Sequence, residues 1–400
     1  MKQLVVVVML NLLLGCEGES GATLPSSEPD GASAVDLQSE ADATVQSSGD
    51  ADVEQADVVA VPEITAPQLG SGDGTPESVT FRVIVGEKWL QEPTDLDFNP
   101  SRPGEMWITN RQSDSFTVVV APGKPEQNIQ KLYDYTEHFA EEVIAISFAD
   151  NNTFGTCGDT NNTYGGLAPG DDFMGPVWWS DDIELFQQET VQEGGAHIDM
   201  LHNSPFCMGI ASAGGSAFYA FNGDGGHIDY YLFGEPHVPG GDDHTDGQKQ
   251  RIAKNVVKRV PGVPSHMILD AETGNLYVAD TGNGRVIRVE TQSGTKGKLL
   301  FANPDPHTTF HEVNGTVVDT VISKESGALV QPAGLTLHNG VLFVSDHQTG
   351  VISAFTLDGK PINELDTGRG ANALGGIAVG DDGFLYFVDM LQNEVVRIEP

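Results

Sequence analysis

From Val79 onward the chain alternates apolar and polar positions over short runs, which is the pattern of half-buried β-strands. One unit recurs most clearly at Val263–Val289, Gln331–Phe355 and Leu374–Ile398. Each copy has a small-residue entry, an apolar strand and a turn. A strand of aromatic and aliphatic residues ending in Asp follows, then a polar turn and a third strand. The repetition predicts a series of similar small sheets.

Looser copies of the unit lie upstream, which gives six in all. The position that ends the second strand is held by Asn110, Cys157, Asn222, Asp280, Asp346 and Asp389. We expect the Asp and Asn side chains there to cap turns through hydrogen bonds to the backbone, and not to act in catalysis. The leftover strand Val79–Val85 is expected to pair with the last unit, because that pairing closes a ring and removes a sheet edge.

The segment Leu276–Val286 reads L-Y-V-A-D-T-G-N-G-R-V and resembles an NHL repeat. The resemblance implies an all-β protein, a six-bladed NHL-type β-propeller covering residues 79–400. There is also a distant resemblance to the peptidyl-amidoglycolate lyase propeller, in which zinc histidines directly follow prolines at blade entries. The matching entries here read Pro93-Thr94, Pro205-Phe206, Pro264-Ser265 and Pro332-Ala333. His266 is displaced by one residue, which argues against that activity.

The N-terminus has the layout of an export signal. Lys2 is followed by the apolar run Leu4–Leu14, which is too short to span a bilayer as a helix. The sequence L-L-G-C at Leu13–Cys16 resembles the bacterial lipobox. The resemblance implies a signal peptide over 1–15, an acylated Cys16, and a lipid anchor in the bacterial cell envelope, at the outer membrane or cell surface rather than the inner membrane.

Residues 16–78 are expected to form a disordered acidic linker. The segment has no Lys or Arg after Cys16, and its apolar residues are small and lack periodicity. Export also implies an oxidising compartment, so Cys157 and Cys207 are candidates for a disulfide, with two buried free thiols as the alternative.

The formal net charge of −38 excludes some partners. Nucleic acid and a polybasic membrane contact are not expected, because both need clustered Lys and Arg. The charge suits a soluble, self-repelling surface or a cationic ligand.

The stretch Gly194–Met267 contains six of the eleven histidines, with several aspartates among them. Alternation of His197 and Asp199 places both on one strand face. Imidazole suits Zn²⁺ and carboxylates suit Ca²⁺, so the stretch is a candidate site for a divalent metal. The candidate ligands are His197, Asp199, His202, His227, Asp242, Asp243, His244, Asp246 and His266. The alternative is that these residues order long loops through hydrogen bonds.

Trp178 and Trp179 add aromatic surface near the acidic loops and are candidate ligand-binding residues. Three functions stay open. The first is a lipid-anchored propeller that binds a small molecule, glycan or protein through loops 194–267, with or without a metal. The second is a metal-dependent lyase or hydrolase of the exported compartment, with His197, His202 or His244 as general base. The third is a structural platform for protein interactions.

Overall fold

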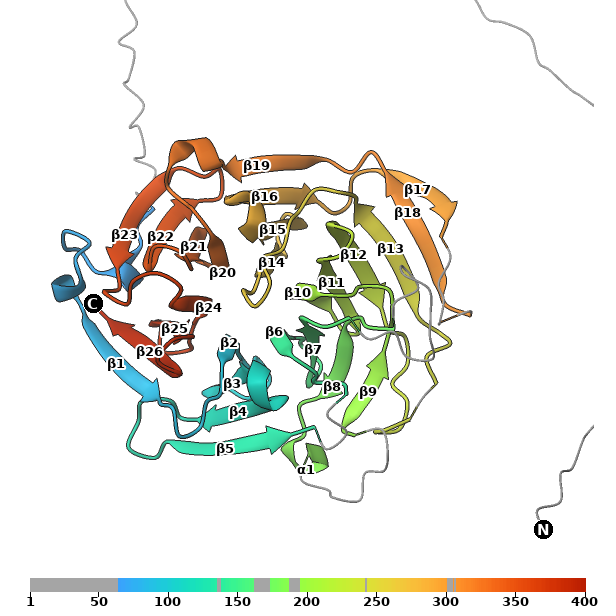
Figure 1. Ribbon diagram of the computed structural model, residues 1–400, viewed down its shortest axis with the longest axis horizontal. Helices are drawn as coiled ribbons and strands as arrows, with labels where there is room; N and C mark the ends of the chain where they lie inside the picture. The colour runs from blue at the N-terminus through green and yellow to red at the C-terminus, as the bar shows by residue number, and fades with distance from the viewer. Residues whose placement is uncertain are drawn as a thin grey trace, which may run out of the picture. The chain divides into compact units, whose positions relative to one another are not determined.

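The computed structural model describes residues 64–134, 138–161, 173–186, 195–241, 243–300, 305 and 307–400. The predicted signal peptide, the lipidation of Cys16 and the linker up to residue 63 lie outside the described residues. The described chain forms six sheets that follow one another around a ring (Figure 1). This arrangement is a six-bladed β-propeller, and it confirms the fold class expected from the repeated strand pattern.

The first three blades follow chain order from the inner strand outward. Blade 1 comprises β2 (Pro93–Phe98), β3 (Glu105–Asn110), β4 (Ser115–Val120) and β5 (Asn128–Tyr133). Blade 2 comprises β6 (Val143–Phe148), β7 (Thr153–Gly158), β8 (Val177–Ser180) and β9 (His197–Met200), with α1 (Ile183–Phe186) after β8. Blade 3 comprises β10 (Cys207–Gly214), β11 (Ala217–Asn222), β12 (His227–Leu232) and β13 (Gln248–Ala253).

The hairpin of β17 (Thr295–Leu299) and β18 (Thr309–Asn314) extends blade 3, with β18 parallel to β13. Blade 4 comprises β14 (Met267–Asp270), β15 (Asn275–Asp280), β16 (Arg285–Glu290) and β19 (Val318–Ile322). Blade 5 comprises β20 (Pro332–His338), β21 (Val341–Asp346), β22 (Val351–Thr356) and β23 (Pro361–Asp366). Blade 6 comprises β24 (Leu374–Val379), β25 (Leu385–Asp389), β26 (Glu394–Glu399) and β1 (Thr80–Val85).

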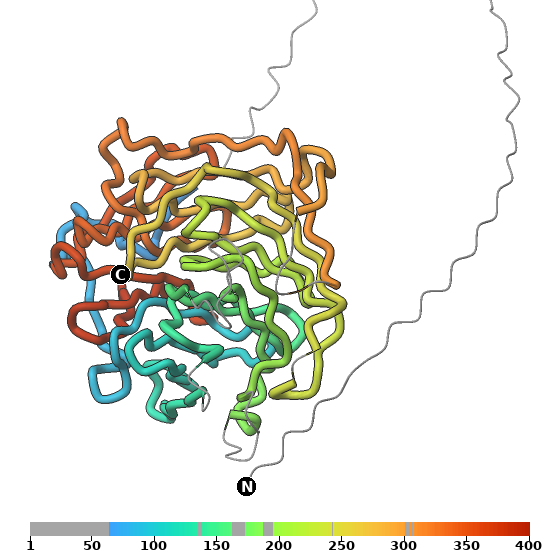
Figure 2. The backbone as a smooth tube through the Cα atoms, turned by 45° about the vertical axis from the view of Figure 1, so that its right-hand side comes forward, coloured from blue at the N-terminus to red at the C-terminus, as the bar shows by residue number. Residues whose placement is uncertain are grey.

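The ring closes through the first and last strands. Strand β1 pairs antiparallel with β26, with Thr80 opposite Glu399 and Val83 opposite Val396. In Figure 2 the blue start of the described chain lies beside the red C-terminal strands. The closing role expected for the leftover N-terminal strand is therefore confirmed. The pairing covers the edge of β26, and β1 becomes the outer strand of blade 6.

Turns after the second strands are held by the acidic side chains that the repeat predicts. Asp346 accepts hydrogen bonds from the backbone N–H groups of Val330, Gln331, Gln348 and Thr349. Asp389 accepts from the N–H groups of Leu391 and Gln392. Both aspartates are buried. These contacts satisfy turn donors that water cannot reach, so the role is structural, as expected.

Residues 64–78 correct the end of the predicted linker, because they pack onto the propeller. Two short 3-10 helices, η1 (Pro67–Leu69) and η2 (Pro76–Ser78), each begin with proline. Leu69 is buried in the cluster of blades 5 and 6. The amide of Asn363 donates to the Gly70 carbonyl at 2.9 Å. The segment therefore packs through Leu69 and two short helices that begin with proline, although its composition alone indicates disorder.

A disulfide joins Cys157 of β7 to Cys207 of β10, with their Cα atoms 5.0 Å apart. It ties blade 2 to blade 3 and confirms the pairing expected for an oxidising compartment. Among the described residues no helix is long and apolar enough to cross a membrane.

Candidate functional site

The outer strand of blade 2 and the long loop of blade 3 meet at the rim of the propeller. His197 and Asp199 both lie on β9, and the loop between β12 and β13 folds over this strand. The His237 N–H donates to the Ile198 carbonyl at 3.0 Å, and the Gly240 N–H donates to the His197 carbonyl at 3.1 Å. These backbone bonds fix the loop, so its histidines stand over the strand.

Three imidazoles converge there, and we call them the rim cluster: His197, His237 and His244. One ring nitrogen from each lies within 4.8 Å of the others. His197 is fully buried and stacks on Phe139, whereas His237 and His244 are half-buried on the solvent side. Three imidazole nitrogens at this separation suit a transition-metal ion.

The tautomers of two rim histidines are set by their neighbours. His244 Nδ1–H donates to Asp199 Oδ1 at 2.8 Å, and His237 Nδ1–H donates to the Val238 carbonyl at 2.7 Å. The lone pair of each ring is then on Nε2. Metal-binding histidines characteristically donate their other nitrogen to a carboxylate or carbonyl in this way.

Within the described residues, only one of the two carboxylate oxygens of Asp199 has hydrogen-bond partners. Its Oδ1 accepts from His244 and from the Met200 N–H at 2.7 Å, but its buried Oδ2 has no hydrogen-bond partner among the described residues. Burial raises the pKa of Asp199 to about 6, against the lowering effect of His244. A cation beside the rim cluster would favour the ionised carboxylate.

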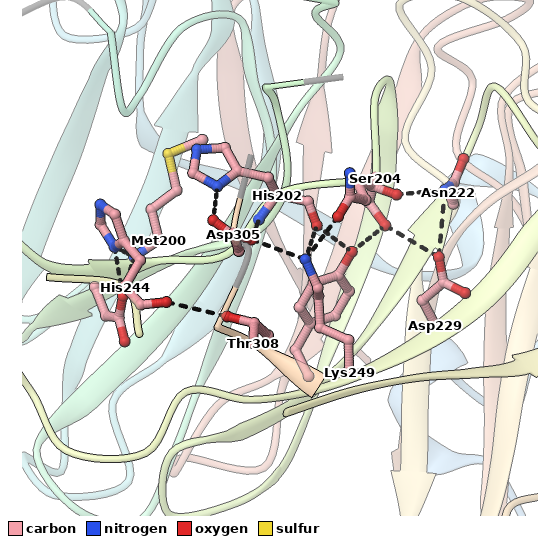
Figure 3. A network of polar contacts seen from close by, with 12 residues as sticks. Met200, His202, Ser204, Asn222, Asp229, His244, Lys249, Asp305 and Thr308 are labelled. Carbon is pink, nitrogen blue, oxygen red and sulfur yellow. Dashed lines mark hydrogen bonds and ion pairs between the residues drawn. The ribbon is translucent and has the colours of Figure 1, made fainter. Parts of the chain in front are cut away.

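A buried chain of charge lies next to the rim cluster (Figure 3). His202 Nδ1 bonds to Asp305 Oδ1, and Lys249 Nζ donates to Asp305 Oδ2 at 2.8 Å. Lys249 also donates to Asn203 Oδ1 at 2.7 Å and to the His202 carbonyl. Although burial alone would raise the pKa of Asp305, His202 and Lys249 hold it well below its usual range.

Burial lowers the pKa of His202, so this ring is neutral at neutral pH. With Nδ1–H given to Asp305, the lone pair is on Nε2. That Nε2 is buried and makes no hydrogen bond within the described part of the chain. The His202 ring lies 5.8 Å from the His244 ring, measured between centroids. His202 therefore presents an acceptor beside the rim cluster.

Strand β12 supplies a rigid wall behind this chain. The Tyr231 hydroxyl bonds to Ser204 Oγ at 2.6 Å and donates to the His202 carbonyl at 3.1 Å. Asp229 forms a two-point ion pair with Arg251, at 2.9 and 3.1 Å. These contacts leave little freedom for the segment that carries His202.

The structure separates the other predicted metal ligands from the rim cluster. His227 begins β12 and accepts a hydrogen bond from the Asn255 N–H at 3.2 Å. Asp243 is exposed and bonds Thr245, and Asp246 accepts from the Glu235 N–H. Asp242 lies outside the described residues. The predicted set is therefore corrected: the cluster keeps His197 and His244, with Asp199 and His202 as neighbours.

His266 belongs to a different group, which we call the channel cluster: Asp95, Asp97 and His266. It lies where the inner strands of the blades meet around the propeller axis. His266 Nε2 pairs with Asp95 Oδ1 across the channel at 2.5 Å, and its Nδ1 contacts the Leu335 carbonyl at 3.1 Å. Burial raises the pKa of Asp97 to about 7.

The two tryptophans are core residues, which corrects their expected role in ligand binding. Trp178 is 3% exposed and Trp179 is fully buried. They lie on successive positions of β8, so their rings point to opposite faces of blade 2. Both faces are covered by neighbouring blades, which leaves neither ring for a surface ligand.

Sequence reasoning missed His237, Lys249 and Asp305 as members of the site. His237 has a local signal, because it sits in a loop rich in Pro, Gly and Asp. Asp305 comes from the β17–β18 connection and meets His202 across 103 residues. No spacing rule predicts that meeting, since it depends on the hairpin joining blade 3 instead of blade 4.

No protein-family model and no curated protein matches this chain. Solved structures do match it. An auxiliary nutrient binding protein from Bacteroides ovatus aligns with a TM-score of 0.51 at 12% identity, over 80% of this chain and 76% of that one. This likeness shows the fold.

Two further propellers are similar to the chain. A gluconolactonase from Xanthomonas campestris aligns with a TM-score of 0.47 at 11% identity, covering 82% of this chain and 91% of its own. Regucalcin from Agrobacterium tumefaciens, a calcium-binding protein, aligns with a TM-score of 0.46 at 12% identity, covering 80% and 95%.

Proposed function

We propose that the protein is an exported, lipid-anchored propeller that binds a zinc-class metal ion at the rim cluster, and a ligand at the ion's open coordination position. The observation that carries this proposal is the convergence of three imidazole nitrogens within 4.8 Å. Imidazole favours Zn²⁺ and similar ions over Ca²⁺, which prefers oxygen. The orientation of His244 by Asp199 supports the same choice.

Zinc titration of the full-length protein tests the site. We expect one ion per chain, with His244→Ala weakening binding by about a hundredfold or more, since it removes a ligand. His227→Ala is the matched control, because His227 belongs to the same histidine-rich stretch but lies outside the rim cluster. Equal zinc affinity in the native protein and in both variants would overturn the assignment.

The lipid anchor is a separate part of the proposal and has its own test. Cys16→Ala removes the acylated residue, so the variant is expected in the soluble fraction when cells are broken. Retention of the variant with membranes would contradict the anchor. It would leave the metal site untouched, since the rim cluster lies wholly within the propeller.

One observation favours a second candidate function, a metal-dependent hydrolase or lyase. His202 stands beside the rim cluster with its Nδ1 fixed by Asp305, which is the arrangement of an oriented general base. A metal-dependent turnover that disappears in His202→Gln, with zinc affinity retained, would select this function over ligand binding alone.

A further inference from the structure

A second candidate site lies in a groove between blades 3 and 4, away from the rim cluster. On the blade 3 side, Tyr219 pairs with Tyr230 across β11 and β12, and Tyr230 pairs with Gln250 across β12 and β13. Directly opposed residues of neighbouring strands point to the same face of a sheet. The three side chains therefore form one row across blade 3.

Blade 4 faces this row with small residues. Ala271 and Gly274 of the β14–β15 turn line the opposite side, together with Gln292 just after β16. The cavity between the two blades has a volume of about 460 Å³. That volume falls within the range of small-molecule sites, roughly 300–1,000 Å³.

The base of the groove is ordered. Tyr219 is 5% exposed, its ring lies 5.3 Å from the Tyr230 ring between centroids, and its hydroxyl faces Thr291. Thr291 Oγ1 donates to the Gly274 carbonyl at 2.7 Å, which fixes the blade 4 side of the groove. A fixed aromatic base gives a bound ring a surface to pack on at little entropic cost.

The polar groups along the walls are available to a ligand. The side-chain amides of Gln250 and Gln292 and the Tyr230 hydroxyl make no hydrogen bond to other described residues, and Tyr230 and Gln250 are only half-buried. Burial raises the pKa of Tyr219 and Tyr230, so both phenols stay protonated as donors. None of the residues lining the groove is Asp, Glu, Lys or Arg.

We propose that this groove binds an uncharged saccharide. Sugar hydroxyls both donate and accept hydrogen bonds, as amides and phenols do, and the C–H face of a sugar ring packs on tyrosine. A charged ligand finds no opposite charge in the lining, and the net charge of −38 repels anions. The site is independent of the metal at the rim cluster.

Ligand-observed NMR and calorimetry on the full-length protein test the proposal, with maltose, cellobiose and lactose as neutral probes and digalacturonate as the charged one. We expect at least one neutral disaccharide to bind and digalacturonate not to bind. Tyr230→Ala and Gln250→Ala should each weaken binding by about tenfold or more. Tyr133→Ala, which removes an exposed tyrosine of β5, should leave binding unchanged.

The absence of binding by all three neutral disaccharides at millimolar concentration would overturn the proposal, and so would binding that Tyr230→Ala leaves intact. Thermal unfolding of each variant separates lost binding from lost folding. Gln292→Ala changes an exposed side chain after β16, so it tests the same groove where the Tyr230 variant does not fold.

Discussion

The rim cluster and the channel cluster both combine histidine with aspartate, yet their partners differ. In the channel, His266 is held at Nε2 by Asp95 and at Nδ1 by the Leu335 backbone, so both ring nitrogens are engaged. At the rim, His244 donates from Nδ1 to Asp199, and Asp199 keeps a buried oxygen without a hydrogen-bond partner among the described residues. The residue types alone therefore do not distinguish a structural cluster from a candidate ligand site. The distribution of hydrogen bonds does.

The channel cluster accounts well for a structural role. Asp95 accepts from the Ile146 N–H of blade 2 while pairing with His266 of blade 4, and Asp97 accepts from the Phe148 N–H at 2.9 Å. These contacts join blades across the axis. The rim cluster joins the outer strand of blade 2 to the β12–β13 loop of blade 3.

The substitution Lys249→Met is expected to have the largest effect on stability. It tests the buried charges beside the rim cluster, which the channel cluster does not share. Removing the buried ammonium leaves the buried Asp305 carboxylate without its cationic partner, with only its hydrogen bonds to His202, which should lower the free energy of unfolding by about 4 kcal/mol. Urea unfolding measures the loss. The double variant Lys249→Met with Asp305→Leu, which removes both charges, should recover much of it. No loss in the single variant would show that the Lys249–Asp305–His202 chain is not holding the site.

Loss of the Cys157–Cys207 disulfide is expected to be the next largest effect. The bond closes a loop with a sequence separation of 50 residues, so its reduction should cost about 3 kcal/mol of stability. Because it ties blade 2 to blade 3, reduction should also weaken zinc binding at the rim cluster. Denaturant melts with and without reductant measure the cost. The double variant Cys157→Ser with Cys207→Ser should not respond to reductant.

A smaller effect is expected from Asp97 in the channel cluster. Its contribution to stability should change with pH in the direction opposite to that of an ordinary carboxylate. Its pKa of about 7 is above the unfolded value, so the folded state holds the proton more tightly. Stability from this residue is therefore present at low pH and is lost as pH rises through 7. Relative to the native protein, Asp97→Asn should gain about 2 kcal/mol between pH 5 and pH 9, after allowance for partial exposure. A pH-independent difference in unfolding free energy would exclude this titration.

Much of the fold could be predicted from the sequence because each copy of the repeat shows its strands and turns within a short segment. The alternating strands, the turn-capping Asp346 and Asp389, and the closing strand β1 follow from periodicity and edge removal. The expected export made Cys157 and Cys207 candidates for a disulfide, and the structure joins them. The packing of Leu69 could not be predicted, since composition cannot show that one apolar residue has a place to dock.

The candidate site could be predicted only where it follows strand geometry. Alternation placed His197 and Asp199 on one face of β9, and both reach the rim. The same His-x-Asp spacing at His227 leads elsewhere, because β12 lies inside blade 3 and not at its rim. The positions of His237 and His244 depend on the conformation of their loop, and the position of Asp305 depends on a long-range hairpin. The local sequence pattern therefore predicts none of these three positions.

The most direct measurement is anomalous diffraction at the zinc edge from crystals of the zinc-treated protein. We predict a single strong peak enclosed by His197, His237 and His244, with a ligand nitrogen from each at about 2.0–2.1 Å. A peak at His266 and Asp95 instead, or no peak at the rim, would contradict the distinction between the two clusters and with it the proposed metal site.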